Sequence, residues 1–317
     1  MRRPSAILDP PAQNCEQLAN ELAARLSSAT RVRRHEPLAK RTTLRVGGPA
    51  DFYVEPASEA DLAATLKFCE QRTLKFFVLG RGSNLLVRDG GFRGVVLCLA
   101  LPQFSRIEIV ENRLHCGAGA KLKQVAVEAR RHGLSGVEFL EGIPGSVGGA
   151  LRMNAGAMGG TTFDMVETIR VMAFNGRIEE FAASDLQFEY RGCALLKNHI
   201  ALAAVFKCAS VPPEEIAQRM NVFSRRRWES QPAAPSAGCI FKNPAAIPAG
   251  KLVDELGLKG SRVGGAMVSM EHGNFIVNDG TATARDVLEL IEVLRQKARA
   301  ARGIELHTEV EIIGDEN

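Results

Sequence analysis

The sequence predicts an α+β protein built from two or three compact units that share a site. The chain has 317 residues, which is more than one domain usually holds. Segments with strand and helix periodicity follow one another along it, and glycine-rich loops lie between them. Its apolar fraction of 45% and charged fraction of 24% are those of a globular chain and argue against a disordered or fibrous protein.

The first unit is expected to contain a helix at 14–28, a strand at 51–55, a helix at 58–72 and a strand at 75–80. Leu18, Leu22 and Leu26 recur at helical spacing in the first helix, and a capping box from Ser58 to Asp61 opens the second. The strand at 51–55 alternates between polar and apolar residues. Strand, helix, strand and glycine-rich loop is the order of an α/β nucleotide-binding unit.

The second unit is expected to contain a hairpin at 106–119 that turns at Glu111 and Asn112, a helix at 121–134 that ends at Gly133, and a hairpin at 169–181 around Asn175 and Gly176. After a turn near residue 212 we expect helices at 214–229 and 282–303, short strands, and a final strand at 305–314. The predicted units are therefore a helical lead-in at 1–30, two lobes at 31–102 and 103–210, and a C-terminal domain at 211–317.

Charge and cysteine content narrow the class of partner. The net charge is only +4, and no broad basic stripe with interleaved aromatic residues is present, so we expect anionic small molecules and no nucleic acid. The arginines at 31–34 are interpreted as a solvated basic face. The seven cysteines include no Cys-x-x-Cys pair, which predicts neither disulfides nor a metal site and fits a reducing cytoplasm. The sequence does not give the oligomeric state, although it slightly favours a monomer.

Membrane and export signals are not expected. Pro4 and Asp9 interrupt the N-terminal segment before an apolar run forms, so no secretory signal is predicted. No window reaches the roughly 18–20 apolar residues that a membrane helix needs.

Three glycine loops, at 79–92, 115–120 and 133–160, carry the strongest local signal. Glycine disfavours regular elements by roughly 0.5–1 kcal/mol relative to alanine. The large number of glycines here therefore indicates that the backbone approaches a ligand or another segment closely. A helix start near Ser146 could direct amides at a pyrophosphate. The alternative from the residues alone is a glycine-rich packing corner. Neither of the first two loops matches the dinucleotide fingerprint.

Several long motifs resemble one family. "TTLRVGGPAD", "LGRGSNLLVRDGGF" and "GLSGVEFLEGIPGSVGGALRMNAGAMGG" are similar, in order and spacing, to the FAD-binding part of the UDP-N-acetylenolpyruvoylglucosamine reductases (MurB). "AGCIFKNP", "AGKLVDELGLKG", "GGAMVSMEHGNFIVN" and "GIELHTEVEIIG" resemble that family's substrate-binding domain. The likeness runs from about residue 36 to residue 314 and, because no long insertion follows "YRGCALLKN", points to the shorter, second-type branch.

The resemblance implies a two-lobed FAD-binding fold of the vanillyl-alcohol-oxidase type followed by a smaller α+β domain. It also implies an activity in peptidoglycan precursor synthesis. NADPH would reduce FAD, and hydride would pass from FAD N5 to C3 of the enolpyruvyl ether of UDP-N-acetylglucosamine.

Three positions match the family's catalytic set. Arg191 corresponds to the arginine at the substrate carboxylate, and Glu309 to the acidic residue that assists the same charge development, as a proton donor if burial raises its pKa. Cys239 stands where the family usually has the serine that protonates C2. A thiol, whose pKa of about 8.5 is far below that of a hydroxyl, is chemically suited to that step. Without the resemblance, we would interpret these residues as a surface arginine, a solvent-facing glutamate and an inert cysteine.

The cofactor and substrate positions are also carried over from the resemblance. The FAD-binding residues are expected to be Gly80, Arg81, Gly82, Ser83, Asn84, Leu85, Gly142, Ile143, Pro144, Gly145, Ser146, Gly148, Gly149, Asn154, Ala155 and Gly156. The substrate-binding residues are expected to be Tyr190, Arg227, Lys242 and Asn243. Arg81 replaces what is often glycine. His115, the histidine nearest to a flavin loop, is interpreted as a strand residue, so we expect non-covalent FAD.

Two other functions remain open. A flavin oxidase acting on an alcohol would use the same fold, but would give "FKNP", "YR" and the C-terminal "EV" no required role. A flavin-binding protein without turnover would be supported only by Cys239. In that case Arg191, Glu309 and Asn243 would be free to differ from the family pattern, yet all three match it.

Overall fold

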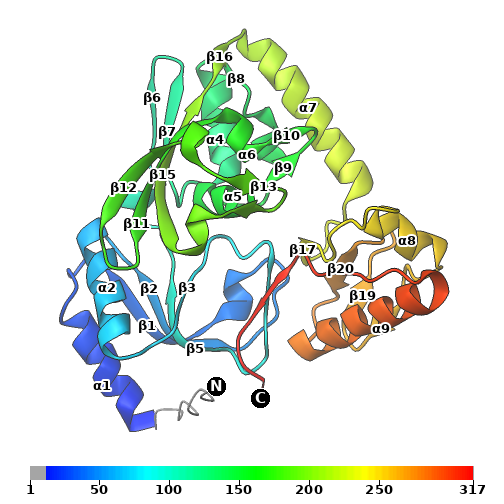
Figure 1. Cartoon of the computed structure of the whole chain (residues 1–317), viewed down its shortest axis with the longest axis horizontal. Coiled ribbons are helices and arrows are strands. Elements are labelled where there is room, and N and C mark those ends of the chain that lie inside the picture. Colours follow the sequence, from blue (N-terminus) through cyan, green and yellow to red (C-terminus); the bar gives the residue numbers. More distant parts are fainter. Residues whose placement is uncertain (1–11, 317) are drawn as a thin grey trace.

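The computed structural model describes residues 12–316, so most of the segment on which the secretory-signal expectation rests lies outside it. Figure 1 shows two lobes stacked one above the other and a smaller C-terminal unit beside them. None of the helices within 12–316 is long and apolar enough to cross a membrane.

Lobe 1 is a four-stranded sheet in the order β1-β2-β5-β3, in which only the β1–β2 pair is antiparallel. Apolar residues of α1, α2 and β2, among them Leu22, Leu66 and Phe52, share one core cluster, so the helices cover one face of the sheet. The elements are α1 (Ala12–Ala23), β1 (Arg31–Pro37), β2 (Pro49–Glu55), α2 (Glu59–Gln71), β3 (Phe76–Val78), β4 (Leu85–Val87) and β5 (Phe92–Leu97).

Strand β2 confirms the expected strand at 51–55, but its predicted alternation is wrong, because both of its faces are buried. Asp51 accepts a hydrogen bond from the Gly94 amide at 2.9 Å and lies 3.0 Å from Arg93. Glu55 lies 3.3 Å from Arg33 of the edge strand β1. Because both carboxylates are paired, polar residues can occupy buried positions that the period-two pattern assigns to solvent.

Helix α1 confirms an amphipathic helix with buried Leu18 and Leu22, but it ends at Ala23 instead of continuing to residue 28. The backbone N–H and the hydroxyl of Ser27 both donate to the Asp61 carboxylate at 2.8 Å, and these bonds compete with continuation of the helix. The same carboxylate was expected to complete a capping box. Ser58 does cap α2 by accepting from the Asp61 N–H at 3.1 Å, but Asp61 bonds to Ser27 and to the Ser58 hydroxyl.

Lobe 2 is built around a five-stranded antiparallel sheet in the order β12-β11-β15-β7-β6. Both expected hairpins and the helix ending before Gly133 are confirmed. Glu111, Gly133 and Gly176 take positive φ angles of 54°, 65° and 86°. Its elements are α3 (Pro102–Ser105), β6 (Ile107–Val110), β7 (Arg113–Gly117), α4 (Leu122–Arg131), β8 (Leu134–Ser135), α5 (Val147–Met153), β9 (Gly156–Ala157), β10 (Gly160–Thr161), α6 (Thr162–Met165), β11 (Val166–Ala173), β12 (Ile178–Ala182), β13 (Phe188–Glu189), β14 (Gly192–Cys193), β15 (His199–Lys207) and β16 (Ala209–Ser210).

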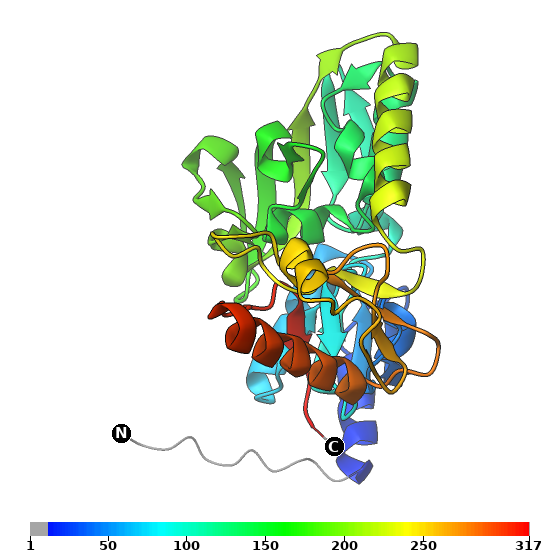
Figure 2. The same cartoon turned by 90° about the vertical axis from the view of Figure 1, so that its right-hand side faces the viewer.

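The C-terminal unit follows α7 (Pro213–Ser230), which runs along the outside of lobe 2 toward it (Figures 1 and 2). Its antiparallel sheet has the order β17-β20-β19-β18, and α8 and α9 share its core cluster. The elements are β17 (Ser236–Cys239), α8 (Ala249–Glu255), β18 (Arg262–Val263), β19 (Ala266–Val268), β20 (Phe275–Asn278) and α9 (Ala284–Arg302). The expected helices at 214–229 and 282–303 are confirmed.

The chain then returns to lobe 1, where β21 (Glu311–Ile313) pairs in parallel with β4. The strand expected at 305–314 is therefore correct only at its end. Residues 305–310 cross from the C-terminal unit to lobe 1 and bond to separate segments: His307 accepts from the Lys242 N–H at 2.9 Å, and Glu309 donates to the Ile240 carbonyl at 2.8 Å. The domain boundaries given above stay a prediction.

Candidate active site

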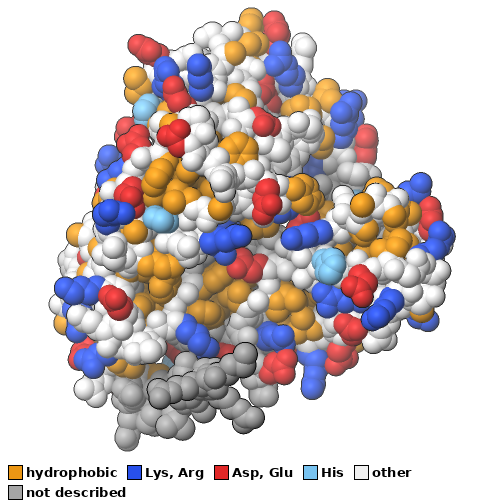
Figure 3. All heavy atoms as spheres, in the orientation of Figure 1, with side chains coloured by type: hydrophobic (Ala, Val, Ile, Leu, Met, Phe, Trp, Pro, Cys, Tyr) orange, Lys and Arg blue, Asp and Glu red, His pale blue; other side chains and the backbone are white. Residues whose placement is uncertain are grey.

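A cavity of about 890 Å³ lies between lobe 1 and lobe 2. Strand β3 and the residues that follow β5 form one side, and α5 and the first part of β15 form the other. In Figure 3 this region is a hollow with hydrophobic side chains inside it and basic side chains at its rim. Its volume falls within the range of about 300–1,000 Å³ that is usual for ligand sites.

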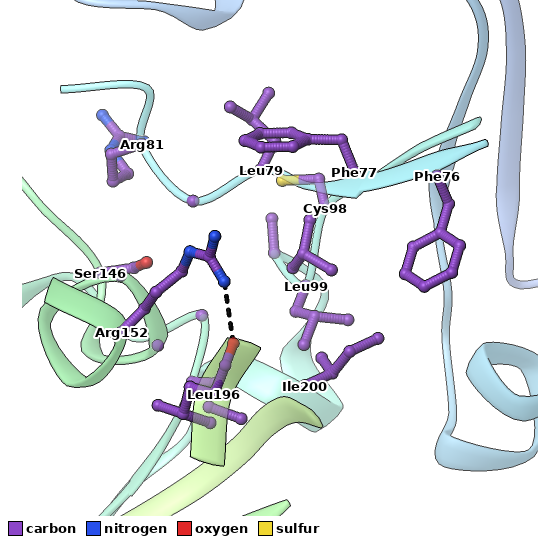
Figure 4. Close-up of a pocket in the computed structure, with 18 of the residues that line it drawn as sticks. Phe76, Phe77, Leu79, Arg81, Cys98, Leu99, Ser146, Arg152, Leu196 and Ile200 are labelled. Carbon is purple, nitrogen blue, oxygen red and sulfur yellow. Dashed lines mark hydrogen bonds between the residues drawn. The ribbon is translucent and has the colours of Figure 1, made fainter. Parts of the chain in front are cut away.

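One wall of the cavity is apolar. Figure 4 shows Phe77, Leu79, Cys98 and Leu99 contributing from lobe 1, opposite Ile200 of lobe 2. A flat aromatic ligand could bury its faces against such a surface.

The first and third glycine loops meet at this cavity. Gly80 and Arg81 of the first loop and Ser146, Gly148 and Gly149 of the third line it. A Cβ on Gly80 would stand 3.0 Å from the Ser146 hydroxyl, and one on Gly148 would stand 3.1 Å from the Ala118 Cβ. A side chain at Gly80 would crowd the junction between these two loops, and one at Gly148 would crowd the second glycine loop within lobe 2, so glycine permits close packing at both positions.

The charged side chains that line the cavity are mainly cationic. Five basic side chains contribute, Lys75, Arg81, Lys121, Arg152 and Lys197, against one acidic side chain, Glu311. Arg152 donates to the Leu196 carbonyl at 2.8 Å and lies 3.3 Å from Glu311. An excess of cationic side chains suits a ligand that carries phosphate.

The remaining cofactor positions do not line the cavity: Gly82, Ser83, Asn84, Leu85, Gly142, Ile143, Pro144, Gly145, Asn154, Ala155 and Gly156. Several of them have structural contacts. Gly82 accepts a hydrogen bond from the Thr43 N–H at 3.1 Å, and Asn154 ends α5 with φ 38° while its amide donates to the Glu189 carbonyl at 3.3 Å. Asn84 donates to the Glu309 backbone carbonyl at 3.2 Å, so the first loop reaches from the cavity to the second cluster described next.

Three side chains from two distant parts of the sequence form this second cluster. Arg191 Nε donates to Glu309 Oε1 at 2.6 Å, and Tyr190 Oη donates to Glu309 Oε2 at 3.1 Å. Burial alone would lower the pKa of Arg191, but the hydrogen bond and charge of Glu309 outweigh it and raise that pKa. Both carboxylate oxygens therefore accept hydrogen bonds, an arrangement suited to the ionised form of Glu309.

Backbone strain accompanies this cluster. Tyr190 and Arg191 form the two-residue tip of the β13–β14 hairpin, and Arg191 has a φ of 59°. This left-handed conformation usually belongs to Gly or Asn and is energetically unfavourable for arginine. Strain of this kind often accompanies functional positions, because the surrounding contacts must hold it.

Cys239 faces the cluster from the end of β17. Burial and the negative charge of Glu309 raise the pKa of its thiol to about 11, and the positive charge of Arg191 only partly offsets them. The thiol is therefore protonated at neutral pH. All seven cysteines lie within the described residues and are free, and only Cys239 is not fully buried.

The three expected catalytic residues are thus brought together, and the expected substrate residues lie at different depths. Tyr190 is 60% exposed. Lys242 and Asn243 are exposed, and Asn243 accepts from the Ala249 N–H at 3.0 Å at the start of α8. Arg227 of α7 packs beside the third glycine loop, since a Cβ on Gly142 would stand 3.6 Å from its Cδ. Burial lowers the pKa of Arg227.

Sequence reasoning missed most of the cavity lining. His115 was singled out as the histidine nearest a flavin loop, whereas the cavity is lined by His199, whose ring nitrogens face the Leu195 carbonyl at 3.1 Å and Glu179 at 3.5 Å. Arg152 could have been predicted as a cavity residue, because it is a basic residue within the third glycine loop. Within residues 12–316, no cluster of acidic, histidine or cysteine side chains could hold a metal ion.

Comparison with known proteins agrees with the resemblance seen in the sequence motifs. Residues 50–182 match an FAD-binding domain model, and residues 231–313 match the model of the UDP-N-acetylenolpyruvoylglucosamine reductase C-terminal domain. The chain is 44% identical over 301 residues to the UDP-N-acetylenolpyruvoylglucosamine reductase of Geotalea uraniireducens, covering 94% of this chain and 99% of that protein. It is 42% identical to reductase 1 of Bacillus cereus over 302 residues, with the same coverage of both chains.

Among solved structures, the enzyme (MurB) from Thermus caldophilus matches with a TM-score of 0.78 and 41% identity, covering 89% of this chain and 99% of that one. These matches confirm the expected α+β fold, with a two-lobed FAD-binding part and a smaller C-terminal domain, and an FAD-dependent oxidoreductase. The chain belongs to the UDP-N-acetylenolpyruvoylglucosamine reductase family.

Proposed function

We propose that this protein uses NADPH to reduce the enolpyruvyl ether of UDP-N-acetylglucosamine to UDP-N-acetylmuramate, in the cytoplasm, as a step of peptidoglycan precursor synthesis. The observation that carries the proposal is the cluster in which Tyr190 and Arg191 donate to Glu309 beside the protonated thiol of Cys239. The printed names of the relatives support the substrate.

The cavity between the lobes fits FAD. Its apolar wall suits a flat ring system, and its cations suit a diphosphate, with Arg81 on the first glycine loop and Arg152 on α5 (Figure 4). FAD, when bound, would accept hydride from NADPH and supply it from N5 to C3 of the enolpyruvyl group. We propose non-covalent binding, because both ring nitrogens of the cavity's His199 already face protein partners.

Arg191 would hold the carboxylate of the enolpyruvyl group. Its Nε donates to Glu309. Within residues 12–316 its two terminal nitrogens make no hydrogen bond, so they can bind an anionic ligand. Addition of hydride to C3 requires that carboxylate to take up electron density, and a fixed guanidinium stabilises the developing charge without reorganisation. Glu309 keeps the guanidinium in place against the strain at Arg191.

Cys239 would then give its proton to C2. Hydride at C3 and a proton at C2 together reduce the double bond by two electrons, with NADPH oxidised to NADP⁺, and the thiolate regains its proton from solvent. Because the thiol pKa is raised to about 11, the donor is fully protonated at working pH. The strained backbone of Arg191 and its ion pair with Glu309 fix the guanidinium that would stabilise the charge. The thiol of Cys239, the proposed proton donor, faces the same pair.

The nucleotide-sugar would be bound by the more exposed residues. Arg227 can pair with a diphosphate through a planar fork, and burial has already removed part of its hydration. Lys242 offers a point charge, and Asn243 retains its amide N–H groups as donors, since only its side-chain oxygen bonds to Ala249.

The experiment is anaerobic stopped-flow absorbance of the purified yellow protein, mixed first with NADPH and then with UDP-N-acetylglucosamine enolpyruvate. We expect the flavin band to bleach and then recover on addition of the sugar, with the lactyl ether formed. Bleaching by an alcohol in place of NADPH, with recovery of the band only on admission of oxygen, would contradict the proposal and favour a flavin oxidase. Absence of any turnover would favour a flavin-binding protein without activity.

A further inference from the structure

Asn274, which no part of the proposed reaction uses, lies directly behind Cys239. It precedes β20, and its residue is only 3% exposed. Its side-chain oxygen accepts from the Phe241 N–H at 2.9 Å, its amide donates to the Phe241 carbonyl at 2.8 Å, and its own carbonyl accepts from the Ile240 N–H at 2.9 Å. Three hydrogen bonds thus fix the two residues that follow Cys239.

The other side of Cys239 is fixed by a bulge in β17. The register with β20 shifts between Ser236, which pairs with Val277, and Cys239, which pairs with Phe275, so β17 contains one extra residue. Gly238 supplies it with a φ of 75°. Bulges of this kind change the direction of the next side chain and often lie beside active sites.

Asn274 is itself held rigidly. Its N–H donates to His272 Nδ1 at 3.1 Å, and the Phe275 N–H donates to the His272 carbonyl at 3.0 Å. Burial, followed by the charge of Lys259, lowers the pKa of His272, so the ring is neutral and Nδ1 can accept. The tight turn before β20 therefore fixes the direction of the Asn274 side chain.

From this geometry we infer that Asn274 is a positioning residue that directs the Cys239 thiol toward the Arg191–Glu309 pair. The inference rests on the proposed role of Cys239 as proton donor. The side chain of Asn274 also lowers the pKa of the thiol, which favours the thiolate left after proton transfer. It thereby opposes the charge of Glu309, while Arg191 and Tyr190 are the other titratable groups beside the thiol.

A purely structural role is the alternative, and the chain offers a matched control. Asn278 is the last residue of β20, is 4% exposed, and also bonds to backbone: its amide donates to the Leu44 carbonyl at 3.0 Å, and its oxygen accepts from the Gly280 N–H at 2.7 Å. It pairs with Ala266 across the sheet and lies three residues along β20 from Phe275, the partner of Cys239. Loss of either asparagine removes buried hydrogen bonds, but only loss of Asn274 should change the orientation and the pKa of the Cys239 thiol.

The test compares Asn274→Ala and Asn274→Asp with Asn278→Ala and Asn278→Asp, all as FAD-loaded protein. The rate of Cys239 alkylation by iodoacetamide is followed against pH by mass spectrometry. We expect both Asn274 substitutions to shift the midpoint of this profile upward by about one pH unit, because the Asn274 amide no longer lowers the pKa of the thiol. Reoxidation of the NADPH-reduced flavin by the sugar should fall about tenfold, with bleaching by NADPH unchanged. If Asn274→Ala does not fold, the isosteric Asn274→Asp variant carries the comparison.

The inference is overturned if the alkylation profiles of the Asn274 and Asn278 variants coincide, whether shifted or not. A Cys239→Ala variant reports separately on the proposed function. If that variant keeps sugar-dependent reoxidation, the proton-donor role fails whatever the alkylation profiles show. If it loses reoxidation but the Asn274 variants behave like the Asn278 variants, only the positioning role fails.

Discussion

Arg191 combines a strained backbone with a buried ion pair. Its φ of 59° would suit glycine better, yet glycine could not bond to Glu309, whose side chain is only 8% exposed. Removing one partner of such a pair leaves an unpaired buried charge, at a cost of about 3–5 kcal/mol, which exceeds the roughly 1–2 kcal/mol of backbone strain. The ion pair therefore determines which residue occupies the tip.

The matching prediction concerns Arg191→Lys. Lysine keeps a positive charge near Glu309 but lacks the planar fork, so it cannot bond to Glu309 and hold both oxygens of a carboxylate. We expect sugar-dependent reoxidation of the flavin to fall by about 100-fold, with unchanged bleaching by NADPH. Equal loss in both half-reactions, measured by stopped-flow absorbance, would place Arg191 outside the substrate-specific step.

At the scale of elements, the site depends on irregular segments between strands. Cys239 is directed by the bulge at Gly238, Arg191 by a two-residue hairpin, and Glu309 by the crossing segment 305–310. Periodicity predicted the helices and hairpins well, because each buries one face. It could not predict that these three residues meet, since each alone fits a surface or core position and only the resemblance singled them out.

The same reasoning explains where the strand prediction failed. Residues 305–314 alternate as a strand would, but the first six bond to several different segments, and a pairing partner cannot be read from one strand's own pattern. In β2, alternation predicted a half-exposed strand, whereas ion pairs at Asp51 and Glu55 allow burial on both faces. Long-range pairing decides both cases.

A capping contact joins lobe 1 to the C-terminal unit. The Asp89 carboxylate accepts from the Ala284 and Arg285 N–H groups at 2.9 Å each, at the start of the 19-residue helix α9. We expect Asp89→Ala to lower the free energy of unfolding by about 1–2 kcal/mol, because two helix N–H groups lose their acceptor and the helix dipole loses a charge. Urea denaturation measures this effect. Asp315→Ala, at an exposed carboxylate, is the control and should stay within about 0.5 kcal/mol of the parent; a similar loss in both variants would refute the capping role.

At the scale of the whole molecule, three bodies enclose the two halves of the site. The cavity lies between the lobes, and the cluster of Arg191, Glu309 and Cys239 forms where lobe 2, the C-terminal unit and the returning segment meet. Arg152 and Glu311 connect lobe 2 with β21 across the cavity. The returning segment thus reaches both parts of the site, since Glu309 belongs to the cluster and Glu311 lines the cavity.

Buried thiols make the stability of the whole molecule sensitive to high pH. Burial raises the pKa of Cys69, Cys116 and Cys208 to about 12, and that of Cys239 to about 11. Unfolded thiols ionise near pH 8.5, so above that pH the unfolded state binds fewer protons than the folded state and stability falls until the folded thiols ionise. Each group contributes a slope of about −1.4 kcal/mol per pH unit.

We therefore expect the free energy of unfolding to decline from about pH 8.5 toward pH 11. Urea denaturation at a series of pH values measures it. Cys69→Ala, which removes one buried thiol, should give a shallower decline. A free energy of unfolding that stays constant or rises over this range would contradict the raised pKa values of the buried thiols.

The central claim is that Cys239 gives the proton to C2, and the most direct measurement compares the parent protein with Cys239→Ser and Cys239→Ala in anaerobic stopped-flow absorbance. All three should be bleached by NADPH at similar rates. On addition of the enolpyruvyl sugar, the parent and the serine variant should recover the oxidised flavin band, and the alanine variant should recover it at least about 100-fold more slowly, because no side chain there can donate. Recovery of the alanine variant at the parent's rate would contradict the claim.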